Sequence, residues 1–145
     1  MTATLGQLID AHGFDVLDHL DREAEIPVLD GLQAQGDLLI IPAAAWSQTI
    51  APQDGLRRDL KPVPAEGIPV IEAAGSGHEH RLFAGTPGTA FWAPPARGGQ
   101  DIGLLECTAP AFVAHPEHAY TGIAPGTYVL RRQREQADEE RLVAD

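Results

Sequence analysis

The chain has 145 residues, 43% of them hydrophobic, with ten basic and twenty-one acidic side chains and a formal net charge of -11. This length suits one domain rather than two, and the hydrophobic content excludes a chain that is disordered throughout. An acidic balance of this size repels phosphate backbones, so we expect no general binding to nucleic acid.

Residues 1–30 predict an N-terminal helical segment. Thr4 and Gln7 have the form of a capping box, in which each side chain satisfies the other's backbone amide. Gly13 either divides the segment into two short helices or weakens one longer helix by about 1 kcal/mol. The segment packs on the core or docks on a protein partner, and both interpretations are open. Its apolar residues recur at helical spacing, at Leu5, Leu8, Ile9, Val16, Leu17 and Leu20.

Residues 35–145 predict a β-rich domain, in which short apolar runs alternate with turns rich in glycine and proline. Residues 43–67 are expected to form a long loop, and the strongly charged residues 136–144 a short C-terminal helix. Six to seven short strands predict a mainly β fold, either a small β-barrel or a sandwich. The strands are expected at 38–41, 68–73, 78–84, 89–92, 102–107, 111–114 and 127–134.

The sequence also predicts a soluble, cytoplasmic protein that binds no membrane. No stretch approaches the roughly 20 apolar residues that span a bilayer. The first residues lack the basic region of a signal peptide and carry Asp10 where its apolar core would be. The single cysteine, Cys107, cannot form an internal disulfide, and a reducing compartment is the simplest account of it.

Four of the six histidines form two tight pairs, His78/His80 and His115/His118. Alternate residues of a strand point to the same face, so His78 and His80 are expected to point one way. Neutral imidazole is the commonest nitrogen ligand of zinc and also binds iron, copper and nickel. These four histidines are therefore the predicted ligands of zinc or another divalent transition metal.

Glutamates accompany both pairs, Glu79 in Gly77-His78-Glu79-His80 and Glu117 in His115-Pro116-Glu117-His118. If the metal keeps an open position, either glutamate is a candidate proton carrier for metal-assisted hydrolysis. The alternative is a non-enzymatic interaction module. Its histidines are structural, and its N-terminal helices or acidic C-terminal tail bind a protein partner.

Five short motifs resemble a pattern shared by a group of small, uncharacterised bacterial and phage proteins. The resemblance covers about residues 35–145 and implies that both histidine pairs belong to the pattern, but it implies no activity. Gln136 stands where the pattern has a tyrosine. The cupin pattern fits less well, because no acid follows Gly77-His78-Glu79-His80 at the required distance. The motifs are Gln35-Gly36-Asp37, Gly77-His78-Glu79-His80, His115-Pro116-Glu117-His118, Pro125-Gly126-Thr127-Tyr128 and Gln133-Arg134-Glu135.

Other reactive or charged residues are expected to have structural roles. Cys107 lies in an apolar run with no base beside it, which favours a buried, inert thiol. Arg131, Arg132 and Arg134 precede an acidic segment, which favours pairing with its carboxylates over phosphate binding. The aromatic residues are expected first of all in the core.

Overall fold

The computed structural model describes residues 3–14, 24–46, 60–71, 79–94, 101–117 and 119–132. His78, His118, Arg134 and the predicted C-terminal helix lie outside these ranges. The described residues are mainly β, with two helices, α1 (Leu5–His12) and α2 (Ala43–Trp46). Neither of these helices is long and apolar enough to cross a membrane.

One sheet has six strands in the order β4-β5-β13-β10-β9-β6. Its two central strands, β13 and β10, come from the second half of the chain, and β5 pairs antiparallel with β13 from Tyr128↔Pro42 to Arg132↔Leu38. The sheet therefore joins strands that lie about ninety residues apart. Its members are β4 (Gln33–Gln35), β5 (Leu38–Pro42), β6 (Lys61–Pro62), β9 (Ala90–Ala93), β10 (Asp101–Cys107) and β13 (Gly126–Arg132).

The second sheet has five strands in the order β3-β12-β11-β8-β7. All of its pairs are antiparallel except β3 with β12, which run parallel. A separate two-stranded pair joins β1 (Ala3–Thr4) to β2 (Glu25–Ile26). The five-stranded sheet consists of β3 (Val28–Leu29), β7 (Ile68–Ile71), β8 (His80–Ala84), β11 (Ala111–His115) and β12 (Ala119–Ile123).

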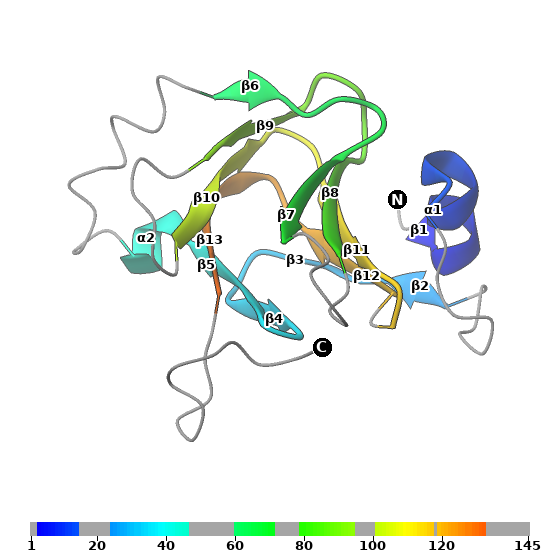
Figure 1. The fold of residues 1–145 in the computed structure, drawn as a ribbon, viewed down its shortest axis with the longest axis horizontal. Coiled ribbons are helices and arrows are strands. Elements are labelled where there is room, and N and C mark those ends of the chain that lie inside the picture. The colour runs from blue at the N-terminus through cyan, green and yellow to red at the C-terminus, as the bar shows by residue number, and fades with distance from the viewer. Residues whose placement is uncertain are drawn as a thin grey trace.

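The two sheets face each other as a sandwich and are not closed into a barrel (Figure 1). Of the two predicted architectures, the sandwich is therefore the one observed. In a barrel the first and last strands of a sheet pair with each other, whereas in both of these sheets they remain separate edge strands. Apolar side chains from both inner faces fill the space between the sheets. This main core includes Leu38, Leu82, Leu105, Val113 and Leu130, each fully buried.

Helix α1 adds a third layer on the outer face of the five-stranded sheet (Figure 1). Thr4 and Gln7 form the capping box that the sequence predicts, and the helix ends at Gly13, whose φ of 67° is left-handed. Leu5 and Leu8 pack into a second cluster with aromatic residues of β8, β11 and β12. Because α1 covers this face, all five residues of the central strand β11 are buried.

His12, in the last turn of α1, docks its ring on this second cluster. The ring stacks on Phe83 with centroids 4.1 Å apart and planes 8° from parallel. Burial lowers the pKa of His12 from its usual value of 6.5, although a hydrogen bond to the Ala84 backbone acts in the opposite direction. A charged His12 is therefore disfavoured in the folded protein.

We expect acid to weaken the protein through His12. A lowered folded-state pKa gives a contribution to stability that is complete above pH 6.5 and is lost as the pH falls through the folded value. His12→Phe keeps the stacked ring but cannot titrate. Between pH 7 and pH 5, the free energy of unfolding of the wild type should therefore fall relative to that of the variant. Parallel urea titrations check this, and a constant difference across that range would show that His12 does not titrate in this way.

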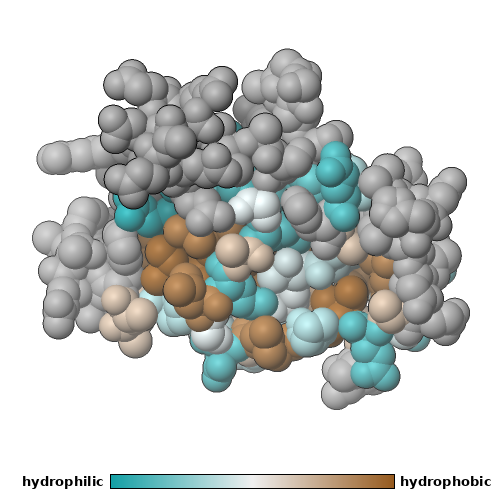
Figure 2. Space-filling view, turned by 90° about the horizontal axis from the view of Figure 1, so that it is seen from below, coloured by the Kyte–Doolittle hydropathy of each residue, from teal (hydrophilic) through white to brown (hydrophobic). Residues whose placement is uncertain are grey.

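The molecular surface seen in Figure 2 mixes hydrophobic and hydrophilic residues, with the hydrophobic ones gathered in separate groups. Among the described residues, the large apolar side chains with high exposure are Leu29, at 49%, and Leu32, at 66%. Leu29 ends β3 and Leu32 immediately precedes β4, at the edge of the sandwich.

Candidate functional site

Two of the predicted metal ligands, His80 and His115, lie side by side between the sheets. β8 and β11 pair antiparallel up to Ala114↔Arg81, so the next opposing positions are His115 and His80. Both side chains are completely buried, and their ring centroids are 4.5 Å apart. The structure therefore brings one member of each histidine pair together, as the metal-site hypothesis requires.

The facing sheet contributes two more polar side chains to the same place. Gln35 ends β4, and Gly36 and Asp37 form the tight two-residue turn before β5, which the Gly36 φ of 57° permits. Both side chains are buried, at 3% and 5% exposure. The hairpin turn thus places an amide and a carboxylate against the two histidines, and we call these four residues the histidine cluster.

Gln35 determines which nitrogen of His80 carries a proton. The Gln35 Nε2 atom donates to the Val113 carbonyl oxygen at 3.0 Å and to Thr121 Oγ1 at 2.9 Å. A carbonyl can only accept, so the amide nitrogen must face Val113 and the amide oxygen must face His80. The Gln35 Oε1 atom lies 2.8 Å from His80 Nδ1. Nδ1 is therefore the protonated nitrogen, and the remaining lone pair of a neutral His80 is on Nε2.

His80 Nε2 lies close to a carboxylate. It lies 3.2 Å from Asp37 Oδ1, and the other oxygen of Asp37 is 4.0 Å from Arg132 Nε. A neutral His80 and an ionised Asp37 would repel each other at this contact. A proton on either side chain, or a metal ion bound to both, would make the contact favourable.

In His115 the hydrogen-bonding role of Nδ1 is the reverse of that in His80. Its Nδ1 accepts a hydrogen bond from the Glu117 backbone amide at 3.0 Å. In the neutral ring the proton is then on Nε2. In this tautomer His115 offers a donor, and it can bind a metal through Nε2 only if the Glu117 contact is broken. The two central histidines are therefore not equivalent.

The two predicted proton carriers lie in different surroundings. The Glu79 carboxylate pairs with the guanidinium of Arg81, which occupies the face of β8 opposite His80 because side chains alternate along a strand. The Glu117 side chain is exposed next to His115. Of the two, Glu117 is the better placed to exchange protons with solvent near the cluster.

His78 and His118, the outer members of the two pairs, lie outside the described residues. Within the parts of the chain that the structure describes, no three or more histidine, cysteine, aspartate or glutamate side chains are arranged to hold a metal ion. A complete metal site therefore requires at least one ligand from beyond these residues. In sequence, His78 precedes His80 by two positions, and His118 follows His115 by three.

A protein family described as a domain of unknown function (DUF8820) matches residues 34–133. The chain belongs to this family. The matched region of the DUF8820 domain contains all four residues of the histidine cluster and excludes α1. Comparisons with curated proteins and with solved structures gave no significant match.

Sequence reasoning identified the histidines of this DUF8820 domain but not Gln35 and Asp37 as site residues. Gly36-Asp37 reads as a turn signal, and turns usually place such side chains in solvent. The one sequence signal for Gln35 and Asp37 was the motif Gln35-Gly36-Asp37, the first of the five motifs that resemble the pattern of the small bacterial and phage proteins. Cys107 is buried as expected, and burial raises the pKa of its thiol, which keeps it protonated and unreactive.

Proposed function

We propose that this protein binds a divalent transition metal, zinc in the first place, at the histidine cluster. The observation that carries the proposal is the contact between His80 Nε2 and Asp37 Oδ1, 3.2 Å apart. Zinc binds imidazole nitrogen and carboxylate oxygen at about 2.0–2.2 Å, and tetrahedral geometry then separates the two ligand atoms by a little over 3 Å. The spacing of these two atoms is therefore compatible with a shared metal ion.

The surroundings of His80 support a ligand role. Ligating histidines usually donate their second nitrogen to an oxygen, which fixes the tautomer and the ring orientation. Gln35 Oε1 accepts from His80 Nδ1 in this way. His78 and His118 are the proposed additional ligands. His115 can bind the metal through Nε2 only if Nδ1 carries the proton. Nδ1 then no longer accepts the hydrogen bond from the Glu117 amide.

The reaction that we propose for an open site is metal-assisted hydrolysis of a small substrate. A metal with a free position lowers the pKa of bound water and polarises a substrate oxygen. Glu117 is the preferred proton carrier and Glu79 the second choice, because Arg81 occupies the Glu79 carboxylate. We further propose that the Gln-Gly-Asp, Gly-His-x-His and His-x-Glu-His motifs form the site signature of the family, since residues of all three meet in the cluster.

A second candidate function, a non-enzymatic interaction module with structural histidines, is favoured by one observation. Both nitrogens of His80 already have partners within the protein, Gln35 and Asp37, so a buried imidazolium can replace the metal. The apolar side of α1 is buried against the sheet, and the opposite side of the helix, at Gln7, Asp10 and Ala11, is exposed. Leu29 and Leu32 offer an apolar surface for a partner.

Elemental analysis of tag-free protein separates the two candidates. We expect about one zinc per chain in the wild type and less than a tenth of that in the double variant His78→Ala/His118→Ala, because at least three ligands are needed to retain the ion. His12→Phe removes a histidine outside the cluster and should keep the full zinc content. Wild-type protein that remains metal-free after zinc is supplied would refute the metal site and favour the interaction module.

A further inference from the structure

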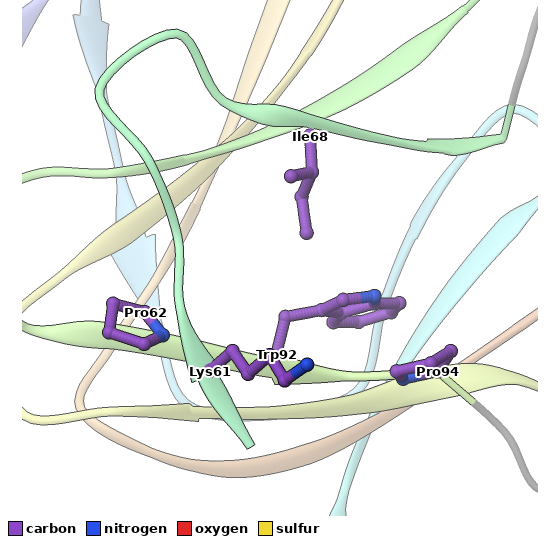
Figure 3. A pocket seen from close by; sticks show the side chains of 5 residues that line it. All are labelled: Lys61, Pro62, Ile68, Trp92 and Pro94. Atoms are coloured by element: carbon purple, nitrogen blue, oxygen red, sulfur yellow. The ribbon is translucent and has the colours of Figure 1, made fainter. Parts of the chain in front are cut away.

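A second site lies at an open side of the sandwich, where β6 and β9 of one sheet approach β7 of the other (Figure 3). It is a cavity of about 450 Å³, within the range of roughly 300–1,000 Å³ that small-molecule sites occupy. Its described lining is apolar apart from one cation. The lining residues are Lys61, Pro62, Ile68, Trp92 and Pro94.

The register of β6 with β9 places the two functional side chains of this cavity next to each other. Lys61 is directly opposite Trp92, and residues opposite each other in a sheet project from the same face. Trp92 is in turn opposite the fully buried Leu105, so this is the inner face of the sheet. Lys61 is exposed, and Trp92 is partly buried against the main core. A cation therefore stands beside an indole ring at the mouth of an apolar cavity.

Gly103 forms the floor under the indole. A Cβ atom at this position would lie 2.4 Å from Trp92 Cζ2, so the ring lies across the glycine backbone. The opposite wall is Ile68, which faces the indole across the open space in Figure 3. One face of the Trp92 ring thus packs on the strand, and the other is directed into the cavity.

The Ile68 wall is held in place by its own contacts. The turn before it closes through a hydrogen bond from the Gly67 amide to the Pro64 carbonyl at 2.8 Å. Arg81 donates to the carbonyl oxygens of Glu66 at 3.0 Å and Gly67 at 3.2 Å. The cavity is therefore formed before any ligand arrives, which reduces the entropic cost of binding.

We propose that this cavity binds a small planar anion of the aromatic carboxylate class. A flat ring would stack on the side of the Trp92 indole that faces Ile68, where stacking and burial of apolar surface supply the affinity. The carboxylate is then within reach of Lys61, the one cationic side chain of the described lining. The site is separate from the histidine cluster and needs no metal.

A lysine on the inward face of an edge strand has another known role, since it discourages edge-to-edge pairing with other chains. That role requires a charge but no ligand. Ligand binding therefore has to be measured directly, with an acid and a neutral compound of the same shape.

The test is a titration of ¹⁵N-labelled full-length protein with 2-naphthoate and with its neutral analogue 2-naphthylmethanol, in the presence of a metal chelator. The Trp92 indole N–H signal, assigned with a Trp46→Phe variant, is the readout. We expect this signal to shift and saturate with naphthoate at a Kd below about 1 mM, and the alcohol to bind more weakly.

Substitutions at Lys61 then test the role of the charge without disturbing the core. Lys61→Gln should weaken naphthoate binding about threefold, as expected for an exposed ion pair, and leave binding of the alcohol unchanged. Lys61→Arg should retain naphthoate binding. No saturating shift of the Trp92 signal at millimolar naphthoate would overturn the proposal. An equal effect of Lys61→Gln on the acid and the alcohol would also overturn it, because the site would then not select an anion.

Discussion

Replacing Gln35 with leucine is expected to lower the free energy of unfolding by about 3 kcal/mol. Leucine has a similar volume but can neither accept from His80 Nδ1 nor donate to the Val113 carbonyl, contacts of 2.8 and 3.0 Å in the wild type. Both groups are buried between the sheets, and each unsatisfied buried group costs about 1–3 kcal/mol. Urea denaturation of the variant beside the wild type measures the loss.

Gln33→Leu is the matched control for this experiment. Gln33 lies on the same strand with the same side-chain direction, and its amide donates to the Gly122 carbonyl at 2.9 Å. It is only half-buried, so water replaces the lost partner and the cost should stay below about 1 kcal/mol. Equal losses in the two variants would contradict the special role of Gln35. If the metal proposal holds, Gln35→Leu should also weaken zinc binding about 10- to 100-fold, and Gln33→Leu should not.

The second large effect is expected at Gly122, where β3 pairs in parallel with β12. A Cβ atom at this position would lie 2.4 Å from the Pro27 carbonyl oxygen and 3.1 Å from Val28 Cγ2. The first of these neighbours is backbone and cannot rotate away. Gly122→Ala should therefore push β3 off the sheet and cost about 2–3 kcal/mol.

Hydrogen exchange adds a local readout for the Gly122 variant. The Ala124 amide donates to the Leu29 carbonyl at 2.9 Å, so its exchange should accelerate when β3 moves. Gly31→Ala is the control, since a Cβ at Gly31 has nothing within 4 Å, and its stability should stay within about 0.5 kcal/mol of the wild type. A Gly122→Ala protein as stable as Gly31→Ala would mean that β3 does not pack as described.

The apolar runs of the sequence predicted most of the longer strands among the described residues. A short apolar run between two turn signals is typical of a buried strand. β5, β8, β10 and β13 all lie on expected segments. β12, Ala119–Ile123, was not predicted, since Gly122 weakens the strand pattern and the preceding His-Pro-Glu-His segment reads as a turn. Barrel and sandwich share the same alternating pattern, so strand pairing alone distinguishes them.

The candidate site was only half predictable for a related reason. Paired histidines stand out in a sequence because their chemistry is specific, and the structure places His80 beside His115. Gln35 and Asp37 acquire their roles from burial, which depends on how the β4–β5 hairpin meets the other sheet. The cavity at Trp92 and Lys61 was also not predictable, because strand register brings together residues thirty-one positions apart.

The strand order of the six-stranded sheet affects how the protein is made. β5 pairs on one side with β4, its neighbour in sequence, and on the other with β13, which ends at Arg132. During synthesis on the ribosome, the apolar run Leu38–Ile41 therefore leaves the exit tunnel long before its second partner exists. Exposed strand edges of this kind attract other chains. The nascent chain is thus expected to depend on chaperones until β13 has been translated.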